Sequence, residues 1–566
     1  MSRRGRRSPG ERAAVGMVLA AVVALVLLPL GRLAQVVVEE GSGTVQALAG
    51  SPGLGADVAR SVALAVVVTA LAVPLGTASA TALAHADVPA RRFWQVAVLL
   101  PLLVPPFVLG YSWTQAYGRA GFTDQLLGLS WPSVLGAAGV VTVLVVNAVP
   151  VVHVIATAGL AARAEPDLAR ASRASGAGAL TSLRTITLPL LRPSIAAAGV
   201  LAFVVTLESF AVPQVMGAPA SFTTVTTRIY SDLALGSDPG SFAQAVALSL
   251  LLVLLAAAVV GPADLALGPR LRVRRSAHTS AAAGPPGSRR AGRLVAALLA
   301  LYLLLAVGLP LTALVAASVT RAVGLPPTPA NWTLDHFRTA LDGDAWAAIG
   351  RSVGLGLAAA TILTLLGGGV AVLERRRSGR GLPTAVTLTL VLPGSTLAVA
   401  LLVTYGRWLG GSLALILLAY LAKLWAYAHR PISGALDRLP PDELRAARAS
   451  GAAPLTAVRT VAMRPLAPAL LAAWLICLLT ALHEVTMSSL LYGPASETIS
   501  VVVLNAQELG GIGITAAISV VLTLLVIVPA VPAWLLARRL RMPSATVRAG
   551  RRASRARQPR EASRAP

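Results

Sequence analysis

The sequence predicts an all-α membrane protein with about twelve transmembrane helices, arranged as two tandem six-helix units. Three observations lead to this prediction. Apolar residues occupy 56% of the 566 positions and charged residues only 13%. The apolar residues form long blocks, which is the pattern of a chain that spans a bilayer and not of a soluble core. Several segments of the first half also recur in the same order in the second half, which indicates an internal repeat.

Each predicted span is an apolar block long enough to cross about 30 Å of hydrocarbon. Six blocks lie in the first half, at residues 14–37, 60–83, 95–117, 133–160, 194–216 and 241–263. Six more lie in the second half, at residues 292–320, 347–373, 383–406, 408–430, 468–492 and 513–538. The first block follows a basic segment but shows no clear small-residue cleavage site. We therefore expect it to be a retained helix and not a signal peptide.

The basic residues behind the net charge of +25 gather in the two tails and in the even-numbered connections between spans. This is the positive-inside pattern. It predicts a multi-pass protein of the bacterial plasma (inner) membrane with both termini in the cytoplasm. Because the charges follow loop parity and do not form one basic surface, nucleic acid is not an expected partner. Membrane lipid is the expected contact of the basic C-terminal tail.

Four pairs of matching segments carry the repeat. RSVALAVVVTALAVPLG from Arg60 resembles RSVGLGLAAATILTLLG from Arg351, and VPPFVLG around Pro105 corresponds to LPGSTLA around Pro393. RASRASGA at 170–177 matches RAARASGA at 445–452, and LESFAVPQVMGAPAS from 207 matches LHEVTMSSLLYGPAS from 482. Both units start in the cytoplasm, so the repeat is parallel, and a translocation path between the halves is expected.

The spans and the repeat together predict the domain organisation. A basic cytoplasmic N-tail (1–13) precedes the first helix with its external loop (14–55) and the first transmembrane domain (56–263). A basic cytoplasmic linker (264–292) leads to helix 7 with its external loop (293–346), the second transmembrane domain (347–538) and a basic disordered C-tail (539–566).

The connection between the fourth and fifth spans of each half is the most informative segment. Each begins with proline followed by an acidic residue, which suits a helix N-terminus. Each helix then stops after about ten residues, at Gly176 or Gly451, where glycine fits a C-terminal cap. One interpretation of a single such segment is a basic helix that rests on anionic lipid headgroups. The presence of two such segments, at equivalent positions in the two halves, favours a role that both halves share.

These two segments resemble the EAA loops of binding-protein-dependent ABC importer permeases of type I, and the resemblance extends over both halves. It implies that each short helix docks into a separate ATPase subunit. The residues that match the EAA pattern are Arg170, Ala171, Ser172, Gly176, Leu188 and Pro189 in the first loop, and Arg445, Ala446, Ala447 and Gly451 in the second. Arginine replaces the family glutamate in both loops. The second loop has Met463 and Arg464 before Pro465 in place of Leu-Pro.

The chain itself is not expected to be an enzyme. A Walker A site needs a lysine after glycine, and the only lysine, Lys423, lies in an apolar span. ATP is therefore expected to be used by two copies of a partner ATPase, and cargo to arrive on an extracytoplasmic binding protein. No cofactor is expected in this chain, and no residue cluster has convincing metal-ligand spacing. The fused halves predict one copy of this chain per complex.

Glu208 and Glu484 are the candidates for the translocation path, because they occupy equivalent places in the fifth span of each half and charges in spans are functional candidates by default. A cation path could use both carboxylates. The alternative is that each glutamate bonds to backbone or to a neighbour and only positions a helix. Lys423 and His483 are plausible partners, and His153 is expected to form an interhelical hydrogen bond.

Substrate and class remain open at this point. The segments after Glu208 and Glu484 resemble fused ferric iron permeases, so ferric iron is the first expectation. Permeases for thiamine, for polyamines and for oxyanions such as sulfate, molybdate or phosphonates share this architecture. A secondary transporter with six plus six spans has the same gross topology, but its usual motif between the second and third spans is missing from the loop 85–92. A membrane enzyme lacks a catalytic constellation in this sequence.

Overall fold

The computed structural model describes residues 9–41, 51–163, 168, 171–172, 174–237, 239–271, 288–342, 345–374, 389, 391–439, 445–447, 449–453, 456 and 458–540. Within these residues the regular elements are helices, apart from one isolated β-bridge between Thr320 and Trp332. Nine helical segments of this described part are long and apolar enough to cross a membrane. The predicted all-helical membrane protein is therefore confirmed.

The first half contains five long helical segments. They are α1, η1 and α2 in one run (Pro9–Val22, Val23–Leu27, Leu28–Glu40), α4 (Leu54–His85), α8 (Ala137–Arg163), α11 (Leu188–Leu207) and α13 (Pro239–Leu271). Short elements connect them: α5 (Arg91–Ala97), η2 (Leu100–Leu103), α6 (Pro106–Tyr117), α7 (Phe122–Leu127), η3 (Pro132–Val134), α10 (Ala179–Ser182), η4 (Leu183–Thr187), η5 (Pro213–Gly217), η6 (Ala218–Ala220), α12 (Val225–Tyr230) and η7 (Ser231–Leu235).

The second half repeats this order. Its long segments are α14, η8 and α15 in one run (Arg289–Leu303, Leu304–Gly308, Leu309–Val319), α17 (Ala345–Glu374), α19 (Gly394–Leu409), α20 (Leu413–Leu436), α23 (Met463–Leu482) and α26 (Ile512–Leu540). Its short elements are η9 (Pro329–Asn331), α16 (Asp335–Leu341), η11 (Val458–Ala462), α24 (Thr486–Leu491) and α25 (Ile499–Glu508).

Three long helices form the same packed group in each half. Helix α4 lies against α8 and α11, and α17 lies in the same way against α20 and α23. A Cβ atom added at Gly76 of α4 would lie 2.6 Å from Cβ of Val152, and one added at Gly367 of α17 would lie 2.9 Å from Cβ of Ala428. The glycine that ends the first repeated segment therefore permits the same close approach of two helices in both halves.

The serine near the start of that repeated segment also has one role in both halves. The hydroxyl of Ser61 accepts a hydrogen bond from the amide of Val225 at 2.9 Å, and the hydroxyl of Ser352 accepts one from the amide of Ile499 at 2.8 Å. Val225 and Ile499 are the first residues of α12 and α25. Free amides at a helix start need acceptors, so each serine holds the start of the short helix that follows the fifth span.

The first span of each half packs against the other half. Helix α2 lies against α19, and α15 lies against α6. The hydroxyl of Tyr405 in α19 donates to the carbonyl oxygen of Ala24 at 2.7 Å, and the hydroxyl of Tyr117 in α6 donates to that of Leu305 at 2.6 Å. The two acceptors lie in the π-helical turns η1 and η8. The two halves are thus joined by a reciprocal pair of bonds, one from each tyrosine.

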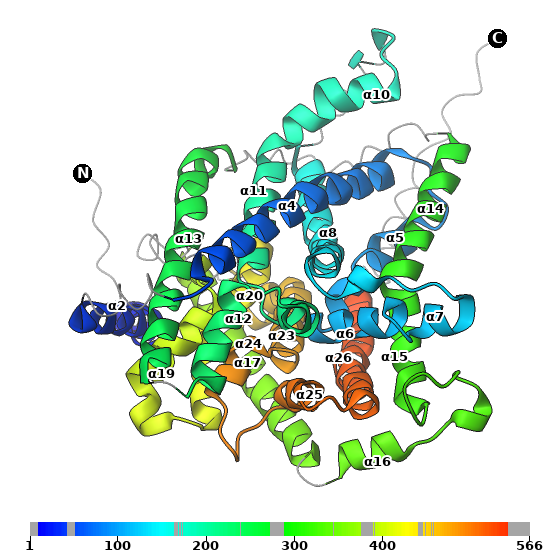
Figure 1. Cartoon of the computed structure of the whole chain (residues 1–566). Coiled ribbons are helices and arrows are strands. Elements are labelled where there is room, and N and C mark those ends of the chain that lie inside the picture. The colour runs from blue at the N-terminus through cyan, green and yellow to red at the C-terminus, as the bar shows by residue number, and fades with distance from the viewer. Residues whose placement is uncertain are drawn as a thin grey trace, which may run out of the picture.

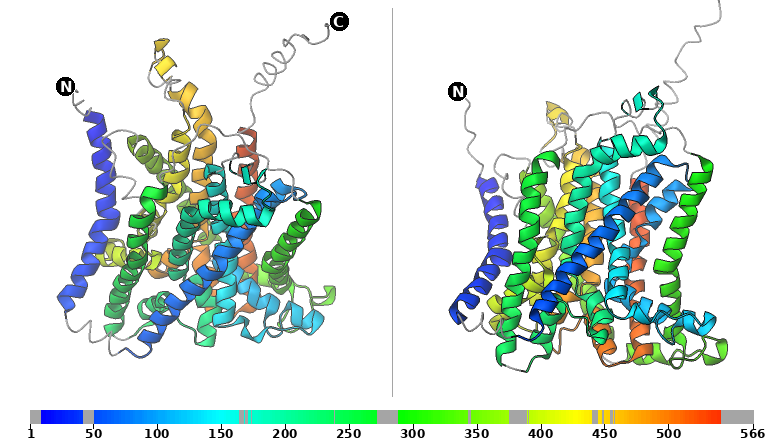
Figure 2. Two further views of the ribbon diagram at one scale, coloured as in Figure 1. Left: turned by 90° about the horizontal axis from the view of Figure 1, so that it is seen from above. Right: turned by 45° about the horizontal axis from the view of Figure 1, so that its top comes forward.

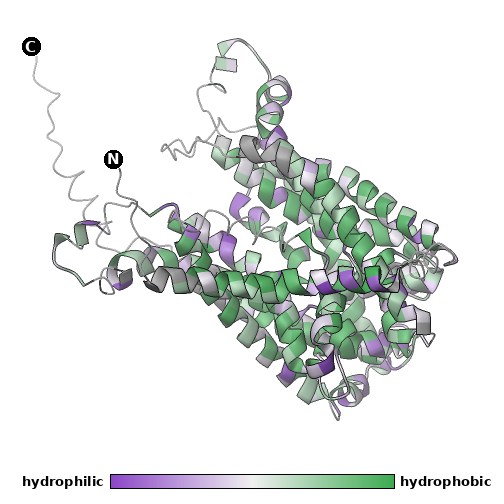
Figure 3. Cartoon of the chain, turned by 90° about the vertical axis from the view of Figure 1, so that its left-hand side faces the viewer, coloured by the Kyte–Doolittle hydropathy of each residue, from purple (hydrophilic) through white to green (hydrophobic). Residues whose placement is uncertain are grey.

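The helices of both halves stand side by side between two faces of the molecule (Figure 2). The start of α1, the region of α10, the segment between α20 and α23 and the end of α26 lie at one face, and α7, α16 and α25 lie at the other (Figures 1 and 2). Hydrophobic residues cover most of the long helices (Figure 3). Leu71, Leu298 and Val528 are examples that are exposed on them, as expected for surfaces that face lipid.

Several predicted spans differ from the helices observed. The third predicted span (95–117) is not one helix, because η2 ends at Leu103 and α6 begins at Pro106. Two consecutive prolines, Pro105 before α6 and Pro106 at its first position, remove backbone donors and break the helix. The predicted spans 194–216 and 468–492 end early, at Leu207 and Leu482. The tenth predicted span overlaps the 24-residue helix α20, which is not one of the nine candidate spans and carries charged and polar side chains.

Four helices extend into the segments predicted as tails and linker. Helix α1 begins at Pro9, α13 continues to Leu271, α14 begins at Arg289 and α26 ends at Leu540. Basic side chains can reach water while their backbone remains helical. The positions where basic residues begin in the sequence are therefore not the ends of the helices. The first part of the ninth predicted span, at 383–388, lies outside the described residues.

Candidate functional site

The first loop between the fourth and fifth spans ends in the predicted way. Its described residues before position 175 are helical, and the chain then turns at Gly176, whose φ is +79°. The amide of Ala177 donates to the carbonyl of Ser172, and the amide of Ser175 to that of Ala171, both at 3.0 Å. These bonds close a Schellman-type helix end, which requires the left-handed conformation that glycine adopts readily. The predicted C-terminal cap is confirmed.

The second loop repeats this geometry. Gly451 has a φ of +84°. The amide of Ala452 donates to the carbonyl of Ala447 at 3.1 Å, and the amide of Ser450 donates to that of Ala446 at 2.9 Å. Both loops therefore end in the same capped turn, on the same face of the molecule (Figure 2).

The matched small residues of the loops lie at the surface. Exposed or half-buried positions are Ala171, Ser172, Ala446 and Ala447. The hydroxyl of Ser172 shares a hydrogen bond of 2.6 Å with that of Ser182, which ties the loop helix to the end of α10. Arg445 is exposed in a helical turn, whereas Arg170 lies outside the described residues. The two loop helices thus present small side chains that a partner surface could approach closely.

A widened helical turn precedes the fifth span in each half. The π-helical turn η4 ends two residues before Pro189, and η11 ends three residues before Pro465. Proline has no amide hydrogen, and its ring crowds the carbonyl four residues earlier. A π-helical turn relieves that crowding. Pro29 and Pro310 follow η1 and η8 in the same way, so the feature recurs in the first and fifth spans of both halves.

Glu208 joins the two halves through an ion pair. It caps the C-terminus of α11 in the first half, and its carboxylate lies 2.6 Å from Nζ of Lys423 in α20 of the second half. Lys423 also donates to the carbonyl of Leu392 at 2.6 Å. Both charged side chains are largely buried. An ionisable group inside a span costs about 2.5 to 3.5 kcal/mol on insertion scales, which pairing offsets. Lys423 was one of the two partners suggested by the sequence.

Glu484 does something different at the equivalent place. It follows α23 and precedes α24, and its carboxylate accepts the amide of Met487 at 2.9 Å and that of Ser488 at 3.2 Å. The hydroxyl of Tyr420 shares a bond of 2.8 Å with that of Ser488. Glu484 therefore caps the start of α24, as the helix-positioning alternative predicts. In the described part of the chain, His483 forms no ion pair with either glutamate.

The prediction that both glutamates lie within the fifth span is wrong in one respect. Both stand where that helix ends, at the residue that caps α11 and two residues after Leu482. A break in a helix leaves backbone amides without partners, and a carboxylate can satisfy them. No hydrogen bond or ion pair between described residues brings Glu208 and Glu484 together.

Two histidines hold adjacent helices together. Nδ1 of His153 in α8 lies 2.8 Å from the hydroxyl of Ser79 in α4, which confirms the expected interhelical bond. Nε2 of His429 in α20 lies 3.0 Å from the carboxylate of Glu374 in α17. Sequence reasoning missed His429, although it stands 276 residues after His153, the same offset that relates Glu484 to Glu208. That offset could have identified it.

A second set of bonds joins the halves near the face opposite the loop helices. Glu508, at the end of α25, accepts hydrogen bonds from Nε2 of Gln214 at 3.1 Å and from the hydroxyl of Tyr230 at 3.3 Å. Both donors belong to the first half. Together with Lys423 and Glu208, these bonds connect the elements that follow the fifth span of the first half to the second half.

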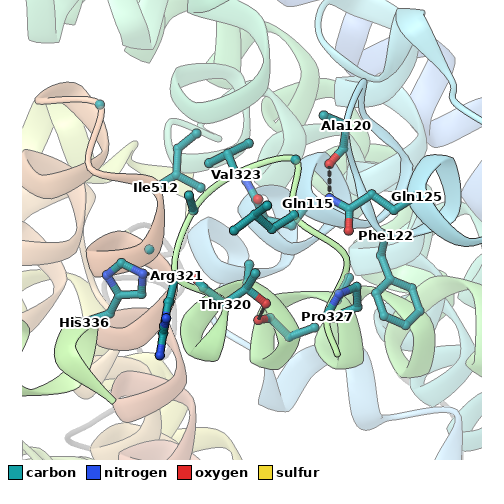
Figure 4. Close-up of a pocket in the computed structure, with 18 residues that line it drawn as sticks. Gln115, Ala120, Phe122, Gln125, Thr320, Arg321, Val323, Pro327, His336 and Ile512 are labelled. Atoms are coloured by element: carbon teal, nitrogen blue, oxygen red, sulfur yellow. Dashed lines mark hydrogen bonds between the residues drawn. The ribbon is translucent and has the colours of Figure 1, made fainter. Parts of the chain in front are cut away.

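A cavity of about 210 Å³ lies on this opposite face, between α6 and α7 of the first half and α15, α16 and α26 of the second (Figure 4). Gln115, Arg321 and His336 contribute polar side chains to it. A larger cavity of about 460 Å³ shares Gln115 and is also lined by Arg119. The sequence did not reveal this site because its residues come from separate loops. Among the described residues, no group of three or more His, Cys, Asp or Glu could hold a metal ion.

The comparisons with known proteins agree with the repeat. The family model of the binding-protein-dependent transport system inner membrane component matches residues 72–264 and again residues 364–542. The chain belongs to this family. It is the permease subunit of an ABC importer, a non-catalytic, multi-pass inner-membrane component that works with an ATPase and a binding protein.

Individual relatives cover either one unit or both. PhnV of Salmonella typhimurium, assigned to a 2-aminoethylphosphonate transport system, is 27% identical over 219 residues, which are 38% of this chain and 82% of PhnV. The molybdenum transport permease ModB of Mycobacterium tuberculosis is 34% identical over 215 residues, 38% of this chain and 80% of ModB. Protein y4fN of Sinorhizobium fredii, named a probable ABC transporter permease, is 25% identical over 501 residues, 82% of this chain and 84% of y4fN.

Proposed function

We propose that this chain supplies both membrane units of an importer for an oxyanion, with twelve spans and both termini in the cytoplasm. The observation that carries the proposal is the double match to the permease family together with the two identically capped loop helices. A secondary transporter shares the topology, but neither the family match nor the paired loops would be expected of one.

Three further segments would complete the twelve spans. They are the broken α5–η2–α6 segment, the segment that ends in α19, and α20. The basic residues at the face of the loop helices favour the cytoplasm for that face. We therefore place the loop helices, the start of α1 and the end of α26 in the cytoplasm, and the cavity around His336 outside.

Each loop helix would dock into one of two ATPase subunits. ATP binding would draw the two ATPases together, carry the capped turns at Gly176 and Gly451 with them, and open the halves outward. Cargo would pass from the binding protein into the path between the halves, and hydrolysis would restore the inward-facing state. With two loops in one chain, a single copy of this chain would serve two ATPases.

An oxyanion fits the interface better than ferric iron. Two of the relatives described above are assigned to phosphonate and molybdenum transport. A ferric path would use the two span glutamates as oxygen ligands. However, Glu208 is paired with Lys423, and Glu484 accepts the backbone amides of α24. Ferric iron, the first expectation from the sequence, therefore lacks Glu484 as a free ligand. An oxyanion needs a cation instead, and Lys423 supplies one when the halves separate.

Uptake by cells with and without this chain tests the proposal. Radiolabelled molybdate, 2-aminoethylphosphonate and ferric iron would be compared, with the chain's own ATPase and binding protein present in both strains. We expect deletion to abolish ATP-dependent uptake of one of the two oxyanions and to leave ferric iron uptake unchanged. Loss of ferric iron uptake alone would reject the oxyanion and retain the permease.

A further inference from the structure

Lys423 is the only lysine of the chain, and its position is unusual. It lies ten residues after the start of the 24-residue helix α20, about 15 Å along the helix axis. Its ammonium group reaches a carboxylate of the opposite half and the carbonyl of Leu392 in its own half. A cation in the middle of a span is costly without a partner, and among the described residues Glu208 is the one acidic side chain within salt-bridge distance of it.

The backbone around this ion pair is irregular. Helix α11 ends at Leu207, Glu208 caps it, and the chain runs without helical structure through Ser209 and Phe210. On the other side of the pair, Leu392 and Pro393 precede α19, which begins at Gly394. Non-helical backbone inside a membrane protein is tolerated where it is buried or lines a cavity. In transporters such breaks surround the substrate site.

The pair also spans the interface that must open during transport. Glu208 follows the fifth span of the first half, and Lys423 belongs to the fourth span of the second half. When the halves separate, Lys423 loses its counter-charge. An unpaired ammonium there favours any anion that enters.

The equivalent place in the other half carries no charge. The offset of 276 residues that relates Val152 to Ala428 in the matched helix contacts also relates Asn147 to Lys423. The side-chain amide nitrogen Nδ2 of Asn147 is buried without a hydrogen-bond partner among the described residues. An orphaned buried donor is unfavourable unless something accepts its hydrogen bond. The first half thus holds a buried, unpartnered amide donor at the position where the second half holds an ammonium group.

We propose that Lys423 binds anionic cargo in the translocation path, and that Glu208 occupies the ammonium group while the path is closed. Asn147 supplies a neutral donor from the other half. This inference rests on the proposed function and adds the residue that selects the charge of the cargo. It differs from a structural ion pair, because a structural pair needs only opposite charges and a cargo site needs the positive charge at position 423.

The double variant Glu208→Gln with Lys423→Gln tests this difference. It removes both charges together, so neither remains buried and unpaired. We expect the variant to reach the membrane and to retain ATP hydrolysis stimulated by the binding protein. Uptake of radiolabelled molybdate or 2-aminoethylphosphonate should fall about tenfold or more, the loss of one charged hydrogen bond to cargo. Uptake at the wild-type rate would overturn the inference.

The charge-swapped variant Glu208→Lys with Lys423→Glu is the second test. A structural pair would be restored by the swap, whereas a cargo site would remain inactive with glutamate at 423. Thr396→Val is the matched control, because it removes a buried bond of 2.9 Å from α19 to the carbonyl of Ser249 in the other half without altering charge. We expect it to transport normally.

The outcomes separate this inference from the proposed function. If the wild-type complex takes up neither oxyanion, the proposed substrate class fails. If the wild type takes up one of them and the swapped variant does so equally well, the importer stands and Lys423 is only a structural partner. Lys423→Arg keeps a cation at the position, and we expect it to retain more uptake than the double glutamine variant.

Discussion

The backbone geometry of the two glycine caps predicts how much an alanine substitution destabilises the end of each loop helix. Gly176 and Gly451 have φ values of +79° and +84°, and a Cβ atom added at either would meet no atom within 4 Å. The cost of alanine there is therefore backbone strain alone, about 1 to 2 kcal/mol for a residue with a Cβ in this conformation. That energy lowers the population of each capped turn about five- to thirtyfold.

Because both turns are exposed, this strain should weaken docking and not the fold. We expect the Gly176→Ala/Gly451→Ala double variant to be present in the membrane at the normal level but to lose most binding-protein-stimulated ATP hydrolysis and uptake. Asparagine tolerates the left-handed conformation better than alanine, so Gly176→Asn/Gly451→Asn should retain more of both activities.

Gly178→Ala is the matched control for the first loop. Position 178 is also free of atoms within 4 Å of an added Cβ, and Gly178 has no positive φ. We expect it to behave like the wild type in purified complexes assayed for ATP hydrolysis and in proteoliposomes assayed for uptake. If the double alanine variant matches Gly178→Ala in both assays, the capped turns do not transmit ATP hydrolysis to the path.

Three further predictions concern the packing of the two halves and can be checked by the thermal unfolding midpoint of the purified chain in detergent. Gly367→Ala should destabilise by about 1 to 3 kcal/mol through overpacking, whereas Gly369→Ala in the same helix, with no atom within 4 Å, should not; equal midpoints would refute the close contact. Ser61→Ala and Ser352→Ala should each cost about 1 kcal/mol and should add in the double variant because the sites are far apart in the fold; a variant with no effect would show that the helix start does not need the serine. Tyr405→Phe should cost about 0.6 kcal/mol, typical of a side-chain hydrogen bond in a membrane protein, and a cost above about 2 kcal/mol would indicate a larger role in joining the halves.

The sequence was sufficient to predict an all-helical membrane protein because long apolar blocks are a strong signal. The repeat was also visible in the sequence, and the structure gives physical reasons for its matched residues. Ser61 and Ser352 hold helix starts, and Gly76 and Gly367 permit close contacts. The left-handed caps at the ends of both loop helices were predictable because glycine is the residue that most readily adopts that conformation.

Broken helices were harder to predict than whole ones. An apolar block continues through a break, so hydropathy placed Glu208 and Glu484 inside the fifth spans, although both follow the end of a helix. Their roles differ because Glu208 pairs with Lys423, which is distant in sequence, whereas Glu484 caps the helix that starts directly after it. The repeat suggested the same role for both glutamates. The second half has Lys423 where the first half has Asn147, so only Glu208 has a lysine partner in the opposite half.

The mass of the detergent-solubilised complex tests the central claim most directly. If the two halves of one chain replace two separate permease subunits and each loop helix docks one ATPase, native mass spectrometry with bound nucleotide should show one copy of this chain with two copies of its ATPase. The Gly176→Ala/Gly451→Ala variant should show loss of ATPase copies. A wild-type complex with two copies of this chain, or with one ATPase per chain, would contradict the account.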